Sequence, residues 1–148
     1  MTRAHHTAIV VDDVAQSLGF WRECIGFQTL MDHEFDGAWT TLFGARDDRL
    51  HSVFLGDPAH PDAGIVELVE FPGGAPAGPA PAIPPRYGFF LVSCYVDVEA
   101  VLARLQAAGL GGTPRRITVP GAGGAEVQMA TVVDPDGVLV ELIGIPAG

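Results

Sequence analysis

Asp13-Val14-Ala15-Gln16-Ser17-Leu18 and Asp97-Val98-Glu99-Ala100-Val101-Leu102 carry one pattern, an aspartate followed by apolar residues at helical spacing. The two aspartates are 97 − 13 = 84 residues apart, which is more than half of the 148 residues. Aspartate is a favourable N-cap, and this apolar spacing predicts a helix with one buried face. Gly26 and Gly109 follow the two patterns and can end each helix in the left-handed conformation. The chain therefore looks like one structural unit written twice.

Short strands are predicted around both helices. In the first half they cover residues 5–11, 27–34, 50–55 and 64–71, and residues 38–43 could belong to a strand or a loop. In the second half they cover residues 88–96, 116–119, 126–133 and 138–143. Asp134-Pro135-Asp136-Gly137 suits a type I turn, so the last two strands should form a hairpin. Each half is therefore βαβββ, and the pair predicts an α+β fold with a cupped mixed sheet.

A segment rich in proline and glycine, residues 72–85, separates the two halves. Proline and glycine at this density continue neither a helix nor a sheet, so the segment is predicted to be a linker. We expect module one at 1–71 and module two at 86–148, within a single domain that spans 1–148. The helix faces toward the core are expected to comprise Val14, Leu18, Trp21 and Ile25 in module one, and Val98, Val101, Leu102 and Leu105 in module two.

The composition limits the classes of function. Hydrophobic residues make up 48% of the chain, which is enough for a buried core, and no apolar run is long enough to cross a membrane. The formal charge of −10 disfavours nucleic acid as a partner. The two cysteines, Cys24 and Cys94, fit buried thiols in a reducing compartment. We therefore expect a cytoplasmic protein that acts on a small molecule, without a nucleic acid or membrane partner.

Two glutamates interrupt strands that are otherwise apolar. Glu67 lies within residues 65–69 and Glu141 within residues 138–143, each in the last strand of its half. A carboxylate at such a position is costly unless a cation, a metal or a hydrogen-bond donor meets it. Each glutamate alone could face solvent, but their duplicated positions favour a shared site. His6 shares one strand face with Ala8 and Val10, and His5 should point to the opposite face.

These residues resemble the vicinal oxygen chelate superfamily, which includes glyoxalase I, methylmalonyl-CoA epimerase, extradiol dioxygenases and the fosfomycin and bleomycin resistance proteins. The opening, residues 6–13 followed by Ser17–Trp21 and Ile25–Phe27, is similar to the first part of that family's pattern. Residues 134–137 running into Val140-Glu141-Leu142 resemble its closing signature. The resemblance covers nearly the whole chain and implies a glyoxalase/bleomycin-resistance-like fold and a homodimer, which would also cover exposed strand edges.

Metal-using members of the family hold a divalent ion with ligands from the first and last strands of each half. By resemblance, His6, Glu67 and Glu141 match three of these ligands. The 84-residue offset puts the fourth at Phe90, which cannot bind a metal, and neither neighbour, Phe89 or Leu91, can replace it. One imidazole and two carboxylates suit Zn²⁺, Ni²⁺, Co²⁺, Mn²⁺ or Fe²⁺.

Two functions remain open at this point. In the first, the chain is a lyase or isomerase that acts next to a carbonyl, with a metal at His6, Glu67 and Glu141 polarising the substrate and with Glu67 or Glu141 moving the proton. In the second, the chain is a metal-free binding protein for an apolar or aromatic molecule, such as a resistance or biosynthetic accessory protein. The residues expected to line the substrate pocket are His51, Phe90, Trp39 and Phe54, and His51 could instead lie at the rim or face outward.

Overall fold

The structure is a computed structural model that describes residues 2–78 and 87–145. It divides into two compact units: unit one comprises Met1–Arg22 and Gly26–Ala77, and unit two comprises Glu23–Ile25 and Gly78–Gly148. The predicted linker, 72–85, lies partly outside the described residues, and its described part, 72–78, contains no helix or strand. None of the described helices is long and apolar enough to cross a membrane.

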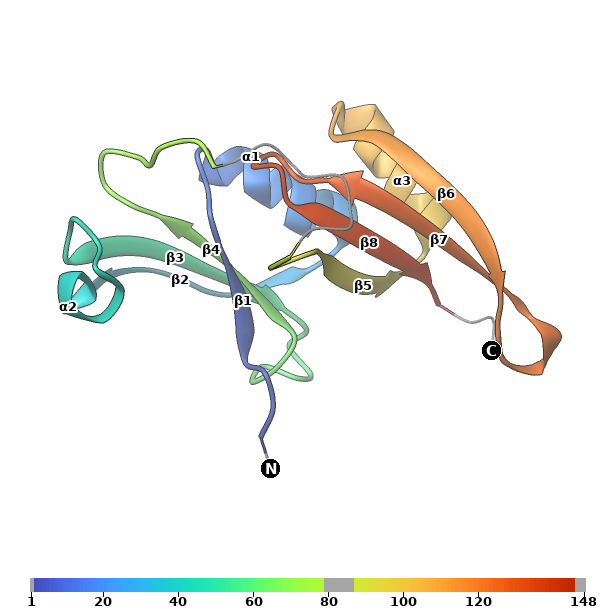
Figure 1. The fold of residues 1–148 in the computed structure, drawn as a ribbon, viewed down its shortest axis with the longest axis horizontal. Helices are drawn as coiled ribbons and strands as arrows, with labels where there is room; N and C mark the ends of the chain where they lie inside the picture. The colour runs from blue at the N-terminus through green and yellow to red at the C-terminus, as the bar shows by residue number, and fades with distance from the viewer. Residues whose placement is uncertain (1, 79–86, 146–148) are drawn as a thin grey trace. The chain divides into compact units, whose positions relative to one another are not determined.

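Unit one contains a four-stranded mixed sheet in the order β1-β4-β3-β2 (Figure 1). Its strands are β1 (His6–Val10), β2 (Gln28–Asp36), β3 (Arg49–Gly56) and β4 (Ile65–Glu70). The pair β1 and β4 is parallel, and the other neighbours are antiparallel. Each predicted strand is present, with bounds that differ by one to two residues. Apolar residues from these strands form the buried core of the unit: Ile9, Val53, Leu55, Ile65, Val66 and Leu68.

The helix of unit one begins as predicted but does not continue as a regular α-helix. Asp13 caps α1 (Val14–Leu18) because its carboxylate accepts a hydrogen bond of 3.1 Å from the Gln16 amide. The chain then continues as η1 (Gly19–Ile25), a π-helical segment with one extra residue in each turn, and ends at Gly26 with a φ of 110°. The predicted buried face is confirmed in its second half, where Trp21 and Ile25 are buried. The fully buried side chains are Ser17, Phe20 and Trp21, whereas Val14 and Leu18 are only half-buried.

Residues 38–43, for which a strand or a loop was expected, instead form the short helix α2 (Trp39–Phe43). The rings of Trp39 and Phe43 are four residues apart and stack, with centroids 5.6 Å apart and planes at 13°. The helix is also held at its beginning, because the Thr40 amide donates to a carboxylate oxygen of Asp48 at 2.8 Å. Asp48 lies in the loop after the helix, outside the apolar pattern of residues 38–43, so that pattern alone does not predict the helix.

Unit two repeats the topology, with the sheet order β5-β8-β7-β6. Its elements are β5 (Val92–Val96), α3 (Val98–Ala108), β6 (Gly111–Pro120), the 3-10 turn η2 (Ala122–Gly124), β7 (Glu126–Val133) and β8 (Leu139–Gly144). Asp97 caps α3 by accepting from the Ala100 amide at 3.0 Å, and Gly109 ends it with a φ of 67°. The first strand was predicted from residue 88 and begins later, at Val92. The predicted α+β fold of two βαβββ modules is confirmed.

The hairpin predicted for the end of the chain is present between β7 and β8, which pair antiparallel. The Gly137 amide donates to the Asp134 carbonyl at 3.1 Å and closes the turn. The buried Asp134 carboxylate also accepts from the amides of Asp136 and Val138, at 2.9 and 2.8 Å. Asp134 therefore stabilises the turn through both its main chain and its side chain.

Candidate functional site

The central feature of unit one is an imidazole beside a carboxylate on neighbouring strands. His6 Nε2 lies 3.1 Å from Glu67 Oε2, and the two side chains are 37% and 13% exposed. Ser52, which is buried in β3, donates from its hydroxyl to Glu67 Oε1 at 3.1 Å. Both oxygens of Glu67 therefore have partners, which explains how an apolar strand accommodates the carboxylate.

His6 is held on its other sides as well. Its ring stacks on Phe54, with centroids 5.5 Å apart, and its Nδ1 lies 2.8 Å from Nδ1 of His5. His5 was expected on the opposite face, and that expectation is wrong because His5 precedes β1, where the alternation of strand faces does not apply. The result is an imidazole whose two nitrogens are both engaged and whose ring orientation is restricted.

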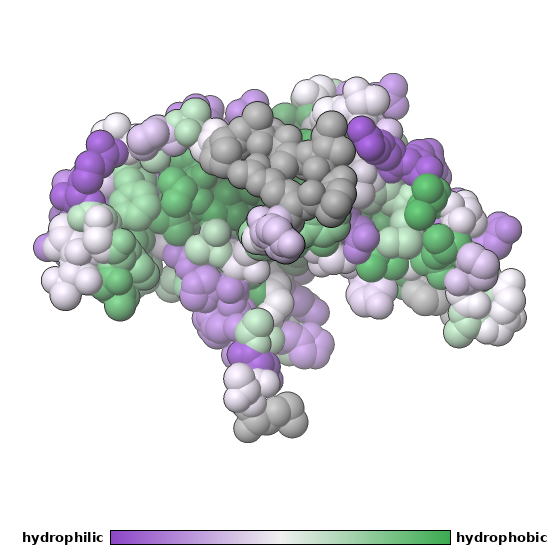
Figure 2. Space-filling model, in the orientation of Figure 1, coloured by the Kyte–Doolittle hydropathy of each residue, from purple (hydrophilic) through white to green (hydrophobic). Residues whose placement is uncertain are grey.

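A pocket of about 570 Å³ extends from this pair within unit one. Its walls are mainly apolar and are formed by Ala8, Val10, Phe43, Leu50, Val69 and Phe71. Figure 2 shows apolar surface gathered over the part of this unit where β4 runs, beside hydrophilic surface toward the N-terminus. His6 and Glu67 are thus polar groups in the lining of an apolar pocket, which is the usual composition of a small-molecule site.

The site includes two residues that the sequence did not identify, Ser52 beside Glu67 and Arg46 in the pocket lining. Ser52 could have been found, because a lone hydroxyl two residues from Phe54 in an apolar strand shares its face. Arg46 could not, because it reaches the pocket through the loop that follows α2.

His51 does not lie among the described residues that line this pocket, contrary to one of the two expectations for it. It projects from the face of β3 opposite to Ser52, and its Nε2 lies 2.6 Å from Asp32 Oδ1. Its Nδ1 lies 3.6 Å from a carboxylate oxygen of Glu70. The hydrogen bond that His51 donates to Asp32 raises the pKa of His51 above its ordinary value, although partial burial opposes that shift.

The three aromatic residues predicted for the pocket occupy different environments. Phe54 stacks on His6 and so borders the polar pair, but it is not among the described residues that line the pocket. Trp39 packs on Phe43 and donates from its indole nitrogen to the Phe35 carbonyl at 3.3 Å, and it is not among the described lining residues. Phe90 belongs to unit two, is 54% exposed and precedes β5.

Glu141 in unit two is also held by a serine, since the Ser93 hydroxyl donates to Glu141 Oε1 at 2.8 Å. Strand pairing places Ser93 opposite Glu141 and Ala8 opposite Glu67. The strands therefore superpose with an offset of 93 − 8 = 85 residues, one more than the helix caps. On this register the counterpart of His6 is Leu91, so the assignment of Phe90 as its counterpart is corrected by one residue.

The donor atoms of His6 and Glu67, an imidazole nitrogen and a carboxylate oxygen, are of the kind that borderline divalent metals accept. Within either unit, residues 2–78 and 87–145 contain no group of three histidine, cysteine, aspartate or glutamate side chains that could hold a metal. Both cysteines are buried, and burial raises the pKa of the Cys94 thiol to about 11. The fit to a metal in unit one is therefore limited to two donors.

This fold is that of a known class: the chain belongs to the Glyoxalase/Bleomycin resistance protein/Dioxygenase superfamily, whose pattern matches residues 3–142. The resemblance to the vicinal oxygen chelate superfamily is thereby confirmed. Among particular relatives, the lactoylglutathione lyase-like protein terB of Aspergillus terreus is 34% identical over 147 residues, which cover 96% of this chain and 75% of that protein.

Solved structures share the fold. A glyoxalase family protein from Bacillus cereus superposes with a TM-score of 0.73 at 18% identity, over 97% of this chain and 94% of that one. The trypanothione-dependent glyoxalase I of Leishmania major superposes with a TM-score of 0.62 at 24% identity, over 97% and 87% of the two chains. At these identities the likeness concerns the fold alone.

Proposed function

We propose that this chain is a glyoxalase-like lyase or isomerase that moves a proton next to a carbonyl of a small-molecule substrate. The observation that carries the proposal is the His6–Glu67 pair, 3.1 Å apart, in the lining of an apolar pocket. The relative from Aspergillus terreus, named as lactoylglutathione lyase-like, supports the same class of reaction. Acid–base chemistry of this kind needs an oriented carboxylate beside a second proton carrier, and the pair supplies both.

In this proposal Glu67 is the general base. Ser52 holds one of its oxygens, so the other is directed toward His6 and the pocket. Glu67 removes the proton from the carbon next to the carbonyl and returns it to a neighbouring atom, while His6 orients the Glu67 carboxylate through the contact between Nε2 and Oε2. The apolar walls keep water from competing for that proton. Glu141 is proposed as a second catalytic carboxylate.

The metal ligands proposed from the family resemblance are His6, Glu67 and Glu141, with Zn²⁺, Ni²⁺, Co²⁺, Mn²⁺ or Fe²⁺ as the ion. A bound ion would polarise the substrate carbonyl and stabilise the enolate that proton removal creates. Metal analysis of protein purified without chelator, followed by removal and add-back, tests this part of the proposal. If the purified protein holds no metal, and if adding metal back does not shift its thermal stability, the ion is ruled out.

A homodimer is proposed as the assembly, because each four-stranded sheet has edge strands that present unpaired backbone groups. Light scattering coupled to size-exclusion chromatography measures the mass directly. A monomer at micromolar concentration would contradict the proposal.

The proton-transfer step is tested by exchange in D₂O. Methylglyoxal with glutathione, and simple α-hydroxycarbonyl compounds, are incubated with the protein, and NMR follows the loss of the α-proton. Glu67→Gln should slow exchange by at least about 100-fold, the usual contribution of a general base. Glu70→Gln is the matched control, since Glu70 lies on the same strand but contacts His51 outside the pocket. Equal rates for wild type and Glu67→Gln would refute the proposed base.

A metal-free binding protein for an apolar or aromatic molecule is the second candidate. It is favoured by Leu91, which brings an apolar side chain to the position equivalent to His6, and by the mainly apolar pocket of unit one. Stoichiometric binding of an apolar compound without metal and without proton exchange would select this function over the first.

A further inference from the structure

Arg46 is the one arginine or lysine among the described residues that line the pocket of unit one. Its guanidinium donates to the Gly74 carbonyl at 3.1 Å. That carbonyl belongs to a turn after β4, which the hydrogen bond from the Gly74 amide to the Phe71 carbonyl closes at 3.1 Å. The long side chain is therefore anchored at the pocket wall by one of its five N–H groups, and the others remain available for a ligand.

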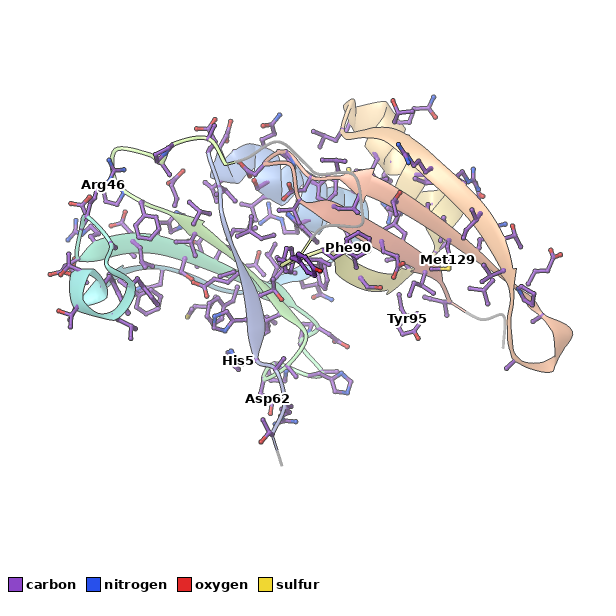
Figure 3. The ribbon with its side chains drawn as sticks, viewed as in Figure 1. His5, Arg46, Asp62, Phe90, Tyr95 and Met129 are labelled. Carbon is purple, nitrogen blue, oxygen red and sulfur yellow. The ribbon has the colours of Figure 1, made fainter. Side chains whose placement is uncertain are left out.

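Arg46 and the His6–Glu67 pair lie at different ends of the pocket. β1 and β4 are parallel, with His6 opposite Ile65 and Val10 opposite Val69. Since Gly74 follows the end of β4, its contact puts Arg46 at the Val10 end. Figure 3 shows Arg46 beside the loop after β4, whereas His5 lies at the beginning of β1. His6 and Val10 are four steps apart along an extended strand, a length of about 13 Å.

The charges around Arg46 differ from those around Arg3 and Arg49 of the same unit. Arg49 is paired with Asp36 at 2.8 Å, and Arg3 is paired with Asp62. For Arg46, the described part of the chain provides a main-chain carbonyl and no ion pair within 4.0 Å. Asp47 also lines the pocket, so it lowers the local positive potential without neutralising the guanidinium by contact.

We infer that the pocket takes an elongated, mainly apolar small molecule with a carboxylate at one end, which Arg46 binds. The reacting carbonyl of that molecule lies at the other end, beside His6 and Glu67, an assignment that rests on the proposed function. A guanidinium recognises a carboxylate through charge-assisted and often bidentate hydrogen bonds. The formal charge of −10 repels anions in general, so one local cation has a large influence on which anion is accepted.

The test uses a probe of matching shape, 4-(4-acetylphenyl)butanoate, and its uncharged carboxamide. Titration calorimetry at low salt measures the affinity of each. Wild type should bind the carboxylate at least about 10-fold more tightly than the carboxamide, as expected for a charge-assisted hydrogen bond. Arg46→Gln should reduce that ratio to about 1 by weakening carboxylate binding alone, and Arg46→Lys should keep part of it.

Two further variants separate the local contact from the net charge. Arg49→Gln changes the total charge by the same amount as Arg46→Gln but lies outside the pocket lining, so it should keep the wild-type ratio. Asp47→Asn should tighten carboxylate binding, because it removes a negative charge from the lining.

The inference is overturned if wild type shows no preference, if Arg46→Gln keeps it, or if neither probe binds. These outcomes are distinct from failure of the proposed function, because binding needs no turnover. A carboxylate preference that depends on Arg46, in a protein without Glu67-dependent proton exchange, supports this inference and refutes the proposed reaction. Glu67-dependent exchange without a carboxylate preference refutes this inference and leaves the reaction standing.

Discussion

The two units share one frame but surround equivalent glutamates with different side chains. Glu67 and Glu141 occupy the same place in the last strand of each unit, opposite a parallel first strand. Beside Glu67 stands His6, whereas the equivalent position in unit two is Leu91. The repeated topology thus fixes where a carboxylate sits, and the neighbours decide what it can do.

The serine that holds each glutamate comes from a different strand. Glu67 accepts from Ser52 on the antiparallel neighbour β3, and Glu141 accepts from Ser93 on the parallel neighbour β5. The counterpart of Ser93 in unit one is Ala8, which lines the pocket. The hydroxyl therefore approaches Glu67 from the antiparallel strand and Glu141 from the parallel strand. In unit one this leaves the side of the parallel strand, β1, open to the imidazole of His6.

The largest expected effect on stability concerns these two serines. Ser52→Ala should lower the free energy of unfolding by about 1–3 kcal/mol, because it leaves a partly buried carboxylate oxygen without its donor. Ser93→Ala should cost less than about 0.5 kcal/mol, because Ser93 is exposed and water can replace it. Urea denaturation measures both values, and equal losses would contradict the difference drawn between the units.

A substitution in unit two tests which residue corresponds to His6. Leu91→His should place an imidazole beside Glu141 and tighten Ni²⁺ binding to that unit about 10-fold, or about 1.4 kcal/mol. Phe90→His is the matched control and should have little effect, because it is out of register. Calorimetric titration with Ni²⁺ distinguishes them, and Glu141→Gln should cancel the gain. A larger gain in Ni²⁺ affinity from Phe90→His would show that Phe90, as the 84-residue offset predicted, corresponds to His6.

The helix caps provide a comparison in which the units should behave alike. Asp13→Ala and Asp97→Ala each remove a carboxylate that accepts from a main-chain amide in the first turn. Each should lower the free energy of unfolding by about 1 kcal/mol. Thermal and urea denaturation measure the loss, with Asp→Asn at each site as a control that preserves the cap. A loss of stability from Asp97→Ala alone would show that the π-helical segment after α1 makes the Asp13 cap unnecessary.

The pH dependence of stability should arise in unit one, which contains all five histidines. The contact with Asp32 raises the folded-state pKa of His51 above its ordinary value of 6.5. The resulting stabilisation is full below pH 6.5 and is lost as the pH rises through the folded-state pKa. His51→Gln should therefore destabilise the protein at pH 6 and approach wild type at higher pH. Urea midpoints across this range check the result, and a constant difference would contradict it.

The local parts of the fold were predictable because their causes lie within a few residues. Asp13, Asp97 and the turn at Asp134 form hydrogen bonds to amides two to four residues away, so composition and spacing identify them. The helix α2 was missed because its support includes Asp48, eight residues from Thr40. The π-helical segment was missed because an extra residue per turn leaves no distinct mark in a short apolar pattern.

The residues of the candidate site also divide into those that the local sequence predicts and those that it does not. Glu67 and Glu141 were identified as costly charges in apolar strands, and alternation placed His6, Ala8 and Val10 together in the pocket lining. The face of His51 was left open, because its partners come from neighbouring strands whose register the local sequence does not specify.

The sequence by itself determined a repeated βαβββ unit, its caps and the two glutamates, since periodicity and local hydrogen bonding specify these features. Only the tertiary structure decided that Ser52 and His6 meet Glu67, that His51 pairs with Asp32, and that Arg46 reaches the pocket. It also moved the counterpart of His6 from Phe90 to Leu91. The physical reason is that strand pairing and loop packing join residues far apart in the chain, and a shift of one residue changes which side chains meet.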